Sequence, residues 1–172
     1  MSKVVAYGPS FEAITEAVTS GIRQQMESRS YQAANELRNS ALIVLRGQRS
    51  GRVYKVPGTY GKRQSKATKQ LMPEYGKKLR GGQLYRASAP GEPPAVRLGH
   101  FRLSWQPEAH VVFGSYISRI ASDLRTDDGK HILGEILEEG TSRMAPRPHH
   151  DRILEHAEPK IYRIYNAPYF ND

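Results

Sequence analysis

Two proline-rich stretches decide how this chain is interpreted: Ser88-Ala89-Pro90-Gly91-Glu92-Pro93-Pro94-Ala95-Val96 and Glu138-Glu139-Gly140-Thr141-Ser142-Arg143-Met144-Ala145-Pro146-Arg147-Pro148. We name them the first proline segment (88–96) and the second proline segment (138–148). A proline cannot donate a backbone hydrogen bond to a strand ladder, and it moves the residue before it away from helical backbone angles. Neither segment holds a nucleophile beside a base or a set of metal ligands, so both predict scaffold turns. The turn residues that we predict are Pro90, Gly91, Pro93, Pro94, Gly99, Gly140, Thr141, Ser142, Pro146 and Pro148.

In their order and spacing, the two segments resemble the tailed-phage head–tail joining family, whose members are also called minor tail or tail-completion proteins. That family carries an Ala-Pro-x-x-(Pro)-x-x-x-Gly-x-(Leu/Phe)-Arg-x-Ser pattern, matched here from Ala89-Pro90 to Gly99-His100-Phe101-Arg102-Leu103-Ser104. It also carries Gly-Thr-Ser-x-Met-x-x-Arg-Pro before a last helix, matched from Gly140 to Pro148. The chain departs from the family at Leu98, where threonine is usual, and at His149-His150, where aromatic residues often stand. The resemblance covers about residues 10–158 and leaves residues 59–83 as a basic insertion.

The resemblance implies an α+β fold, with a long N-terminal helix and short C-terminal helices packed on a small antiparallel sheet. It implies a non-enzymatic virion protein of the neck or tail, made in the bacterial host cytoplasm and needing no cofactor or metal. Its copies would form a ring, hexameric in preference to dodecameric, between the head and the tail. The expected partners are the adjoining connector, tail terminator or tail tube proteins, and double-stranded DNA that passes through the lumen.

Length and composition agree with one lean domain spanning residues 1–172. A chain of 172 residues can bury a fair core, but its apolar content of 38% and mean hydropathy of −0.65 are low. We therefore expect burial to be completed against neighbouring molecules. Cysteine is absent, which excludes disulfides, thiolate catalysis and cysteine zinc sites. No stretch approaches the ~20 apolar residues of a membrane span, and the apolar part of the N-terminus is too short for a signal peptide.

The positive charge is concentrated in one part of the chain. Residues 46–80 hold eleven Lys and Arg residues and one acid, Glu74, whereas the rest of the chain has a net charge of −1. This asymmetry favours a polyanion or an acidic protein as partner, and a solvated basic loop is the alternative. Apolar residues within the segment, such as Leu71 and Met72, favour a protein contact over a phosphate contact. The candidate contact residues are Arg49, Arg52, Lys55, Lys62, Arg63, Lys66, Lys69, Lys77, Lys78 and Arg80.

Helical periodicity is strongest at the N-terminal end. Apolar residues recur every three or four positions from 10 to 46, with Ser10 as a candidate N-cap. The length suggests a break near Gly21 or residues 28–30, and Gly47 is the expected C-terminal stop. A short amphipathic piece over 132–137 is expected to end at Gly140, with that glycine at positive φ. Another helix is expected to begin at Pro148 and to turn Ile153, Leu154 and Ala157 inward.

Strand patterns fill the middle of the chain and its C-terminal end. Alternation predicts strands over 52–56, 83–87 and 101–105, the last ended by Pro107. A longer strand is expected over 111–120, with a possible bulge at Gly114. Residues 160–165 also alternate, so 159–172 is expected to form an edge strand or an arm.

Candidate catalytic groups are few. His149, His150 and Asp151, with His156 nearby, are the best metal candidates, but their spacing does not place two ligands on one helix face, so we interpret them as structural or surface residues. We interpret Asp127-Asp128-Gly129 as a turn, and Glu135, Glu138 and Glu139 as a solvated helix face.

The alternative function is a non-specific DNA-binding or nuclease-like phage accessory protein that uses residues 46–80. A ribosomal or chromatin-like basic protein would explain the charge but not the two proline segments.

Overall fold

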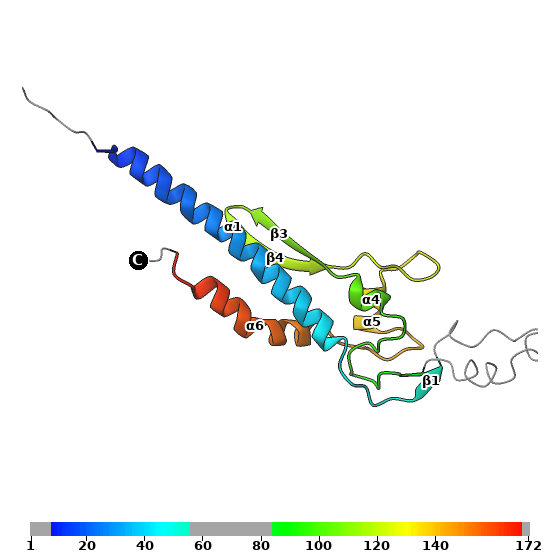
Figure 1. The fold of residues 1–172 in the computed structure, drawn as a ribbon. Coiled ribbons are helices and arrows are strands. Elements are labelled where there is room, and N and C mark those ends of the chain that lie inside the picture. The colour runs from blue at the N-terminus through cyan, green and yellow to red at the C-terminus, as the bar shows by residue number, and fades with distance from the viewer. Residues whose placement is uncertain (1–7, 56–83, 170–172) are drawn as a thin grey trace, which may run out of the picture.

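The computed structural model describes residues 8–55 and 84–169 (Figure 1). The fold is α+β, as predicted, with a long N-terminal helix, short C-terminal helices and two small antiparallel sheets. Its elements are α1 (Phe11–Val44), β1 (Val53–Lys55), β2 (Leu84–Arg86), α4 (His100–Leu103), β3 (Gln106–Val112), β4 (Ser115–Ala121), α5 (Leu133–Glu139) and α6 (His150–Asn166). None of the helices in the described ranges is long and apolar enough to cross a bilayer.

Helix α1 is the element on which α6 and the β3–β4 hairpin pack. Ser10 begins it as predicted, because its side-chain oxygen accepts a hydrogen bond from the backbone N–H of Ala13 at 3.2 Å. The predicted break is wrong: the helix runs through Gly21 and residues 28–30 for 34 residues without interruption. The predicted stop at Gly47 is also wrong by one turn, since the helix ends at Val44 and Gly47 lies in the turn that follows.

Small side chains on α1 let its neighbours approach closely. Ala33, Ala34 and Ala41 are fully buried, and Ser30 turns its hydroxyl towards β4, 3.1 Å from the hydroxyl of Ser118. The β3–β4 hairpin and α6 both lie along this part of α1, whereas its N-terminal turns extend past them (Figure 1). These contacts hold α1 in one piece where local sequence favoured a break.

The hairpin corrects two strand predictions. β3 pairs with β4 from Gln106↔Ala121 to Val112↔Ser115, so residues 111–120 are two strands and not one. Phe113 and Gly114 connect them at φ 49° and 78°, and two positive φ values in succession make a tight hairpin turn instead of the bulge predicted at Gly114. Pro107 lies inside β3, opposite Ile120, which a two-stranded sheet tolerates because each strand has a free edge.

Residues 101–105 do not form the predicted strand. Gly99 adopts φ 88°, and α4 begins immediately after it. Its turn directs Phe101 and Trp105 into one core cluster with Ala41, Leu45 and Ile153. The alternation that suggested a strand therefore reflects burial on one side of a short helix and the residues after it.

Helix α6 replaces the edge strand or arm predicted for 159–172, at least as far as Asn166. Pro159 lies inside this helix although proline removes a backbone hydrogen bond there. Contacts with α1 continue on both sides of the proline: His156 meets Ser40 at 3.0 Å, and Lys160 meets Glu36 at 2.9 Å. Burial against α1 thus extends the helix beyond the residue that should have stopped it.

Gly140 ends α5, and its φ of 80° is positive as predicted. With its ψ of −170°, this is a backbone conformation that is essentially restricted to glycine. An added Cβ would lie 2.7 Å from the carbonyl oxygen of Met144 and 2.8 Å from the nitrogen of Pro146. Gly129 has a comparable φ of 70° but no atom within 4 Å of an added Cβ. A side chain at Gly140 would therefore suffer both backbone strain and a steric collision, whereas a side chain at Gly129 would suffer backbone strain alone.

We predict that Gly140→Val destabilises the fold by on the order of 1–2 kcal/mol or more, because the β-branched side chain is strained at positive φ and also collides with the second proline segment. Gly129→Val carries the strain alone and should cost less. Denaturant unfolding of the two variants measures the difference. Equal stability of Gly140→Val and the wild type would contradict the structural role assigned to this glycine.

Candidate functional site

The two proline segments, about fifty residues apart in sequence, meet in space. The backbone N–H of Gly91 donates to the carbonyl oxygen of Pro146 at 3.2 Å. The guanidinium of Arg147 donates to the carbonyl oxygen of Ala89 at 2.8 Å and also to that of Ser88. Arg152, from the first turn of α6, donates to the carbonyl oxygen of Gly91 at 3.0 Å. We call this contact region the junction.

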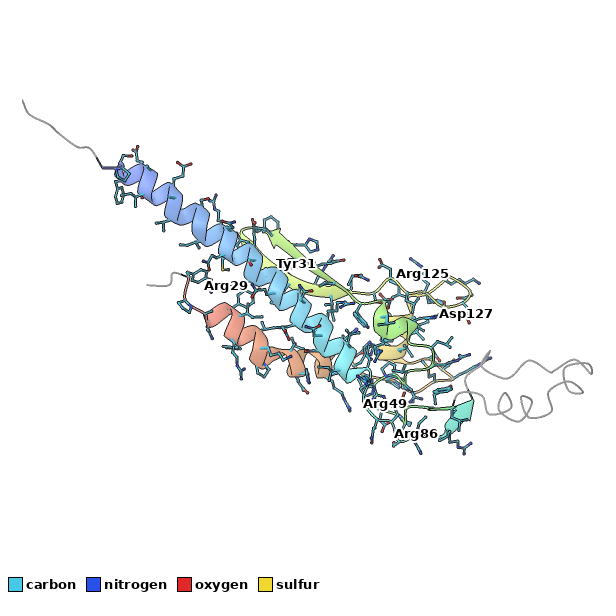
Figure 2. All side chains as sticks on the ribbon, viewed as in Figure 1. Arg29, Tyr31, Arg49, Arg86, Arg125 and Asp127 are labelled. Carbon is cyan, nitrogen blue, oxygen red and sulfur yellow. The ribbon has the colours of Figure 1, made fainter. Side chains whose placement is uncertain are left out.

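Two further residues tie the end of α1 into the junction. Arg49 donates to the carbonyl oxygens of Val44 at 2.9 Å and Pro94 at 3.1 Å, and its burial lowers its pKa below the ordinary value (Figure 2). The Glu92 carboxylate accepts the backbone N–H groups of Ser50 at 3.0 Å and Ala89 at 2.8 Å. A side-chain hydrogen bond with Ser50, followed by the two backbone bonds, lowers the pKa of Glu92 to about 2. The junction therefore joins three separate parts of the chain through hydrogen bonds to backbone.

The predicted turn residues lie in and around the junction. Pro93 and Pro94 are buried, and Gly91, Gly99 and Gly140 all have positive φ. The side-chain oxygen of Thr141 accepts the backbone N–H of Met144 at 3.1 Å and so closes the turn that carries Ser142. Pro148 is not the first helical residue: His149 is the N-cap and α6 begins at His150.

The carboxylate of Glu138 caps the start of α6, although the sequence suggested that it was solvated. One oxygen of Glu138 accepts the backbone N–H of His149 at 2.9 Å and that of His150 at 3.3 Å, and lies 2.7 Å from the Nδ1 of His149. His149 is fully buried, with its ring edge-on to Phe101 and Trp105 at 5.4 and 5.9 Å between centroids. An acid eleven residues before a histidine gives no local signal, so sequence reasoning missed this pair.

Among residues 8–55 and 84–169, one group of side chains could hold a metal ion: Glu138, His149 and His150. One ligand atom from each lies within 4.8 Å of the others, and oxygen and imidazole nitrogen are donors that zinc accepts. The Glu138 oxygen, however, is already the acceptor for two backbone N–H groups at the start of α6. We interpret the group as a helix cap that is anchored in the core by His149.

The predicted basic contact residues separate into three groups. Arg49 is an internal structural group of the junction and not a free contact residue. Arg52 is exposed beside β1, and Lys55 pairs in register with Leu84 of β2. Lys55 and Leu84 lie on either side of the basic insertion in sequence. The remaining residues lie outside the described part of the chain: Lys62, Arg63, Lys66, Lys69, Lys77, Lys78 and Arg80.

Comparison with known proteins found no matching family model, no matching curated protein and no matching solved structure. The junction is thus characterised by its own geometry. The junction contains no nucleophile beside a base. Its arginine side chains donate hydrogen bonds to backbone carbonyl oxygens, and its glutamate accepts hydrogen bonds from backbone N–H groups. Its chemistry is that of a structural clamp.

The buried His149 predicts a pH dependence of stability. Burial lowers its pKa from the ordinary 6.5, against smaller opposing effects of the Arg147 carbonyl and Glu138. The unfolded chain therefore binds this proton more readily, so the free energy of unfolding should fall as the pH drops below about 6.5, by at most ~1.4 kcal/mol per pH unit for one proton. His149→Phe should flatten the profile between pH 7.5 and 5.5, above the range in which Glu92 titrates.

The control is His131→Gln, which changes an exposed histidine. Urea unfolding at several pH values compares the three proteins, and His131→Gln should keep the wild-type slope. Parallel profiles for the wild type and His149→Phe would show that His149 does not titrate on unfolding.

Proposed function

We propose that this chain is a structural protein of the phage neck or tail, which forms a ring that joins the DNA-filled head to the tail. The observation that carries the proposal is the uncovered N-terminal end of α1. Every residue from 11 to 20 is exposed, including Phe11, Ile14 and Val18. A long helix with an apolar stripe that no described part of its own chain covers is suited to contact with another molecule.

The junction supports the same proposal, because it contains residues that carry the resemblance to the family. Several residues that carry the resemblance to the head–tail joining family lie in the junction, among them Ala89 and Arg147. Their role in this fold is to fix the ends of α1, α5 and α6 relative to one another. A ring subunit needs such rigidity because its contact surfaces must keep a constant angle for the ring to close.

In the proposed assembly, identical subunits associate head to tail around a lumen that double-stranded DNA can pass. Six copies are favoured, to match the tail, and the outer faces contact the adjoining connector, tail terminator or tail tube proteins. Contact with DNA in the lumen is sequence-independent and weak enough to allow sliding. The protein acts by assembly in the virion and not as an enzyme.

We expect the purified chain to assemble into a closed ring of six copies, each of 19.4 kDa, with more than ~1,000 Å² buried at each subunit contact. Native mass spectrometry gives the copy number and negative-stain images show the lumen. A chain that stays monomeric at every concentration, with and without tails, would contradict the proposal.

The second candidate is a non-specific DNA-binding or nuclease-like accessory protein, and the charge of residues 46–80 favours it. Binding to duplex DNA that is tight, sequence-independent and steeply weakened by salt would support this candidate. Metal-dependent cleavage of plasmid DNA, lost in Glu138→Gln, would support the nuclease form. The ring proposal expects no cleavage.

The basic insertion gives a further prediction, although it lies outside the described residues. Replacement of Lys62, Arg63, Lys66 and Lys69 together by serine should leave the fold intact and reduce the joining of heads to tails. The thermal melting temperature checks the fold, and the yield of infectious particles checks joining. Lys3→Ser, a change outside the basic segment, is the control. Normal particle yields from the quadruple variant would leave the solvated-loop interpretation standing.

A further inference from the structure

The exposed end of α1 has a defined apolar face. Phe11, Ile14, Val18 and Ile22 recur at intervals of three and four residues and so lie on one side of the helix. Their side chains are 83%, 48%, 43% and 37% exposed. We call residues 11–22 the helix tip; it extends beyond the hairpin and α6 in Figure 1.

A groove at the opposite end of α1 has the complementary character. Where α1 ends beside α4, an open groove of about 500 Å³ is lined by Leu42, Ile43, Arg46, Gly47, Arg102 and Leu103. Ile43 and Leu103 are 51% and 55% exposed, so the groove presents apolar surface to solvent. We call it the basic groove, because both of its charged residues are arginines.

The charges of the two surfaces are opposite. Residues 8–22 contain Glu12 and Glu16 and no lysine or arginine, whereas the groove lining contains two arginines and no acid. None of these four residues forms an ion pair within the described part of the chain. The two carboxylates lie one turn apart, about 100° (Glu12) and 140° (Glu16) around the helix from Phe11, so Glu12 lies on the flank of the apolar face. Arginine side chains at the rim of a groove can extend along that flank.

The tip cannot occupy the groove of its own chain. Both surfaces lie on the single unbroken helix α1, and the rise of ~1.5 Å per residue separates Glu16 from Val44 by about 40 Å. A straight helix does not fold back over that distance. Among the described segments, the one that matches the groove in apolarity and charge is therefore the helix tip of a second copy.

We infer that the helix tip of one subunit docks in the basic groove of the next, and that this is the contact that closes the proposed ring. The inference rests on the proposed function and names its interface. Because the two surfaces differ and lie at opposite ends of α1, each subunit can offer its tip to one neighbour and its groove to another. Repetition of that contact gives a ring or a filament, whereas two antiparallel copies that exchange tips would give a closed two-fold dimer.

Two substitutions test the two halves of the contact. Val18→Arg places a charge on the apolar face of the tip, and Leu103→Glu places an acid in the groove. Their controls are Ser20→Arg, about 200° around the tip from Val18, and Leu154→Glu, at a leucine of α6 that is 56% exposed. Each test variant should raise the dissociation constant for self-association at least about tenfold. The controls should assemble as the wild type does, and circular dichroism checks that all four variants fold.

A mixing experiment distinguishes this contact from others. Val18→Arg keeps an intact groove and Leu103→Glu keeps an intact tip, so a 1:1 mixture should form pairs that contain one copy of each and grow no further. Native mass spectrometry resolves the two masses. Pairs formed by Leu103→Glu alone would indicate a tip-to-tip contact and overturn the inference.

The outcomes separate the inference from the function on which it rests. Rings formed by the wild type and by both test variants alike would overturn the docking contact and leave the ring proposal standing. Wild-type chains that stay monomeric, together with a mixture that yields no pairs, would overturn both.

Discussion

The contact between Arg147 and the carbonyl oxygens of Ser88 and Ala89 is the interaction on which the rest of the structure depends. It joins two proline segments that cannot pair through strand ladders, because prolines lack the necessary N–H groups. An arginine replaces the missing donors with a planar group that can serve two acceptors at once. Arg49 and Glu92 extend the same principle to the end of α1. The fold is thus held at one end by side chains bonded to backbone, and this arrangement suits a chain with little apolar interior.

The hydrophobic core is small, and its position explains the shape of the molecule. Ala41, Leu45, Trp105 and Ile153 cluster where α1 ends, next to the junction. Away from this cluster, α1 packs through alanine and serine, which bring the hairpin and α6 close but bury little apolar area. Within residues 8–55 and 84–169, nothing covers the first turns of α1. An interior of this kind leaves apolar surface at both ends of one helix, and the proposed head-to-tail contact buries both surfaces together.

Particular residues show why sequence reasoning succeeded in some places and failed in others. Ser10 as N-cap and Gly140 at positive φ were predicted correctly, because each depends on the backbone within a few residues. Residues 159–172 were predicted as an edge strand or arm, but contacts from α6 to Ser40 and Glu36 accompany a helix that continues past Pro159 to Asn166. The helix α1 also continues through Gly21, where a break was predicted. The Glu138–His149 cap gave no signal, since the two residues meet only when α5 and α6 are in place.

The α+β fold class was expected from the family resemblance. The sequence by itself determined that Ser10 begins a helix, that the two proline segments interrupt regular structure, and where charge is concentrated. These properties follow from proline and glycine backbone limits, from residue counts and from apolar periodicity, all of which act locally. Only the tertiary structure decided that the two proline segments meet, that Arg49 is an internal clamp, and that residues 160–165 are helical. Each of these depends on burial and hydrogen bonding between residues far apart in the chain, and such contacts exist only after the elements have packed together.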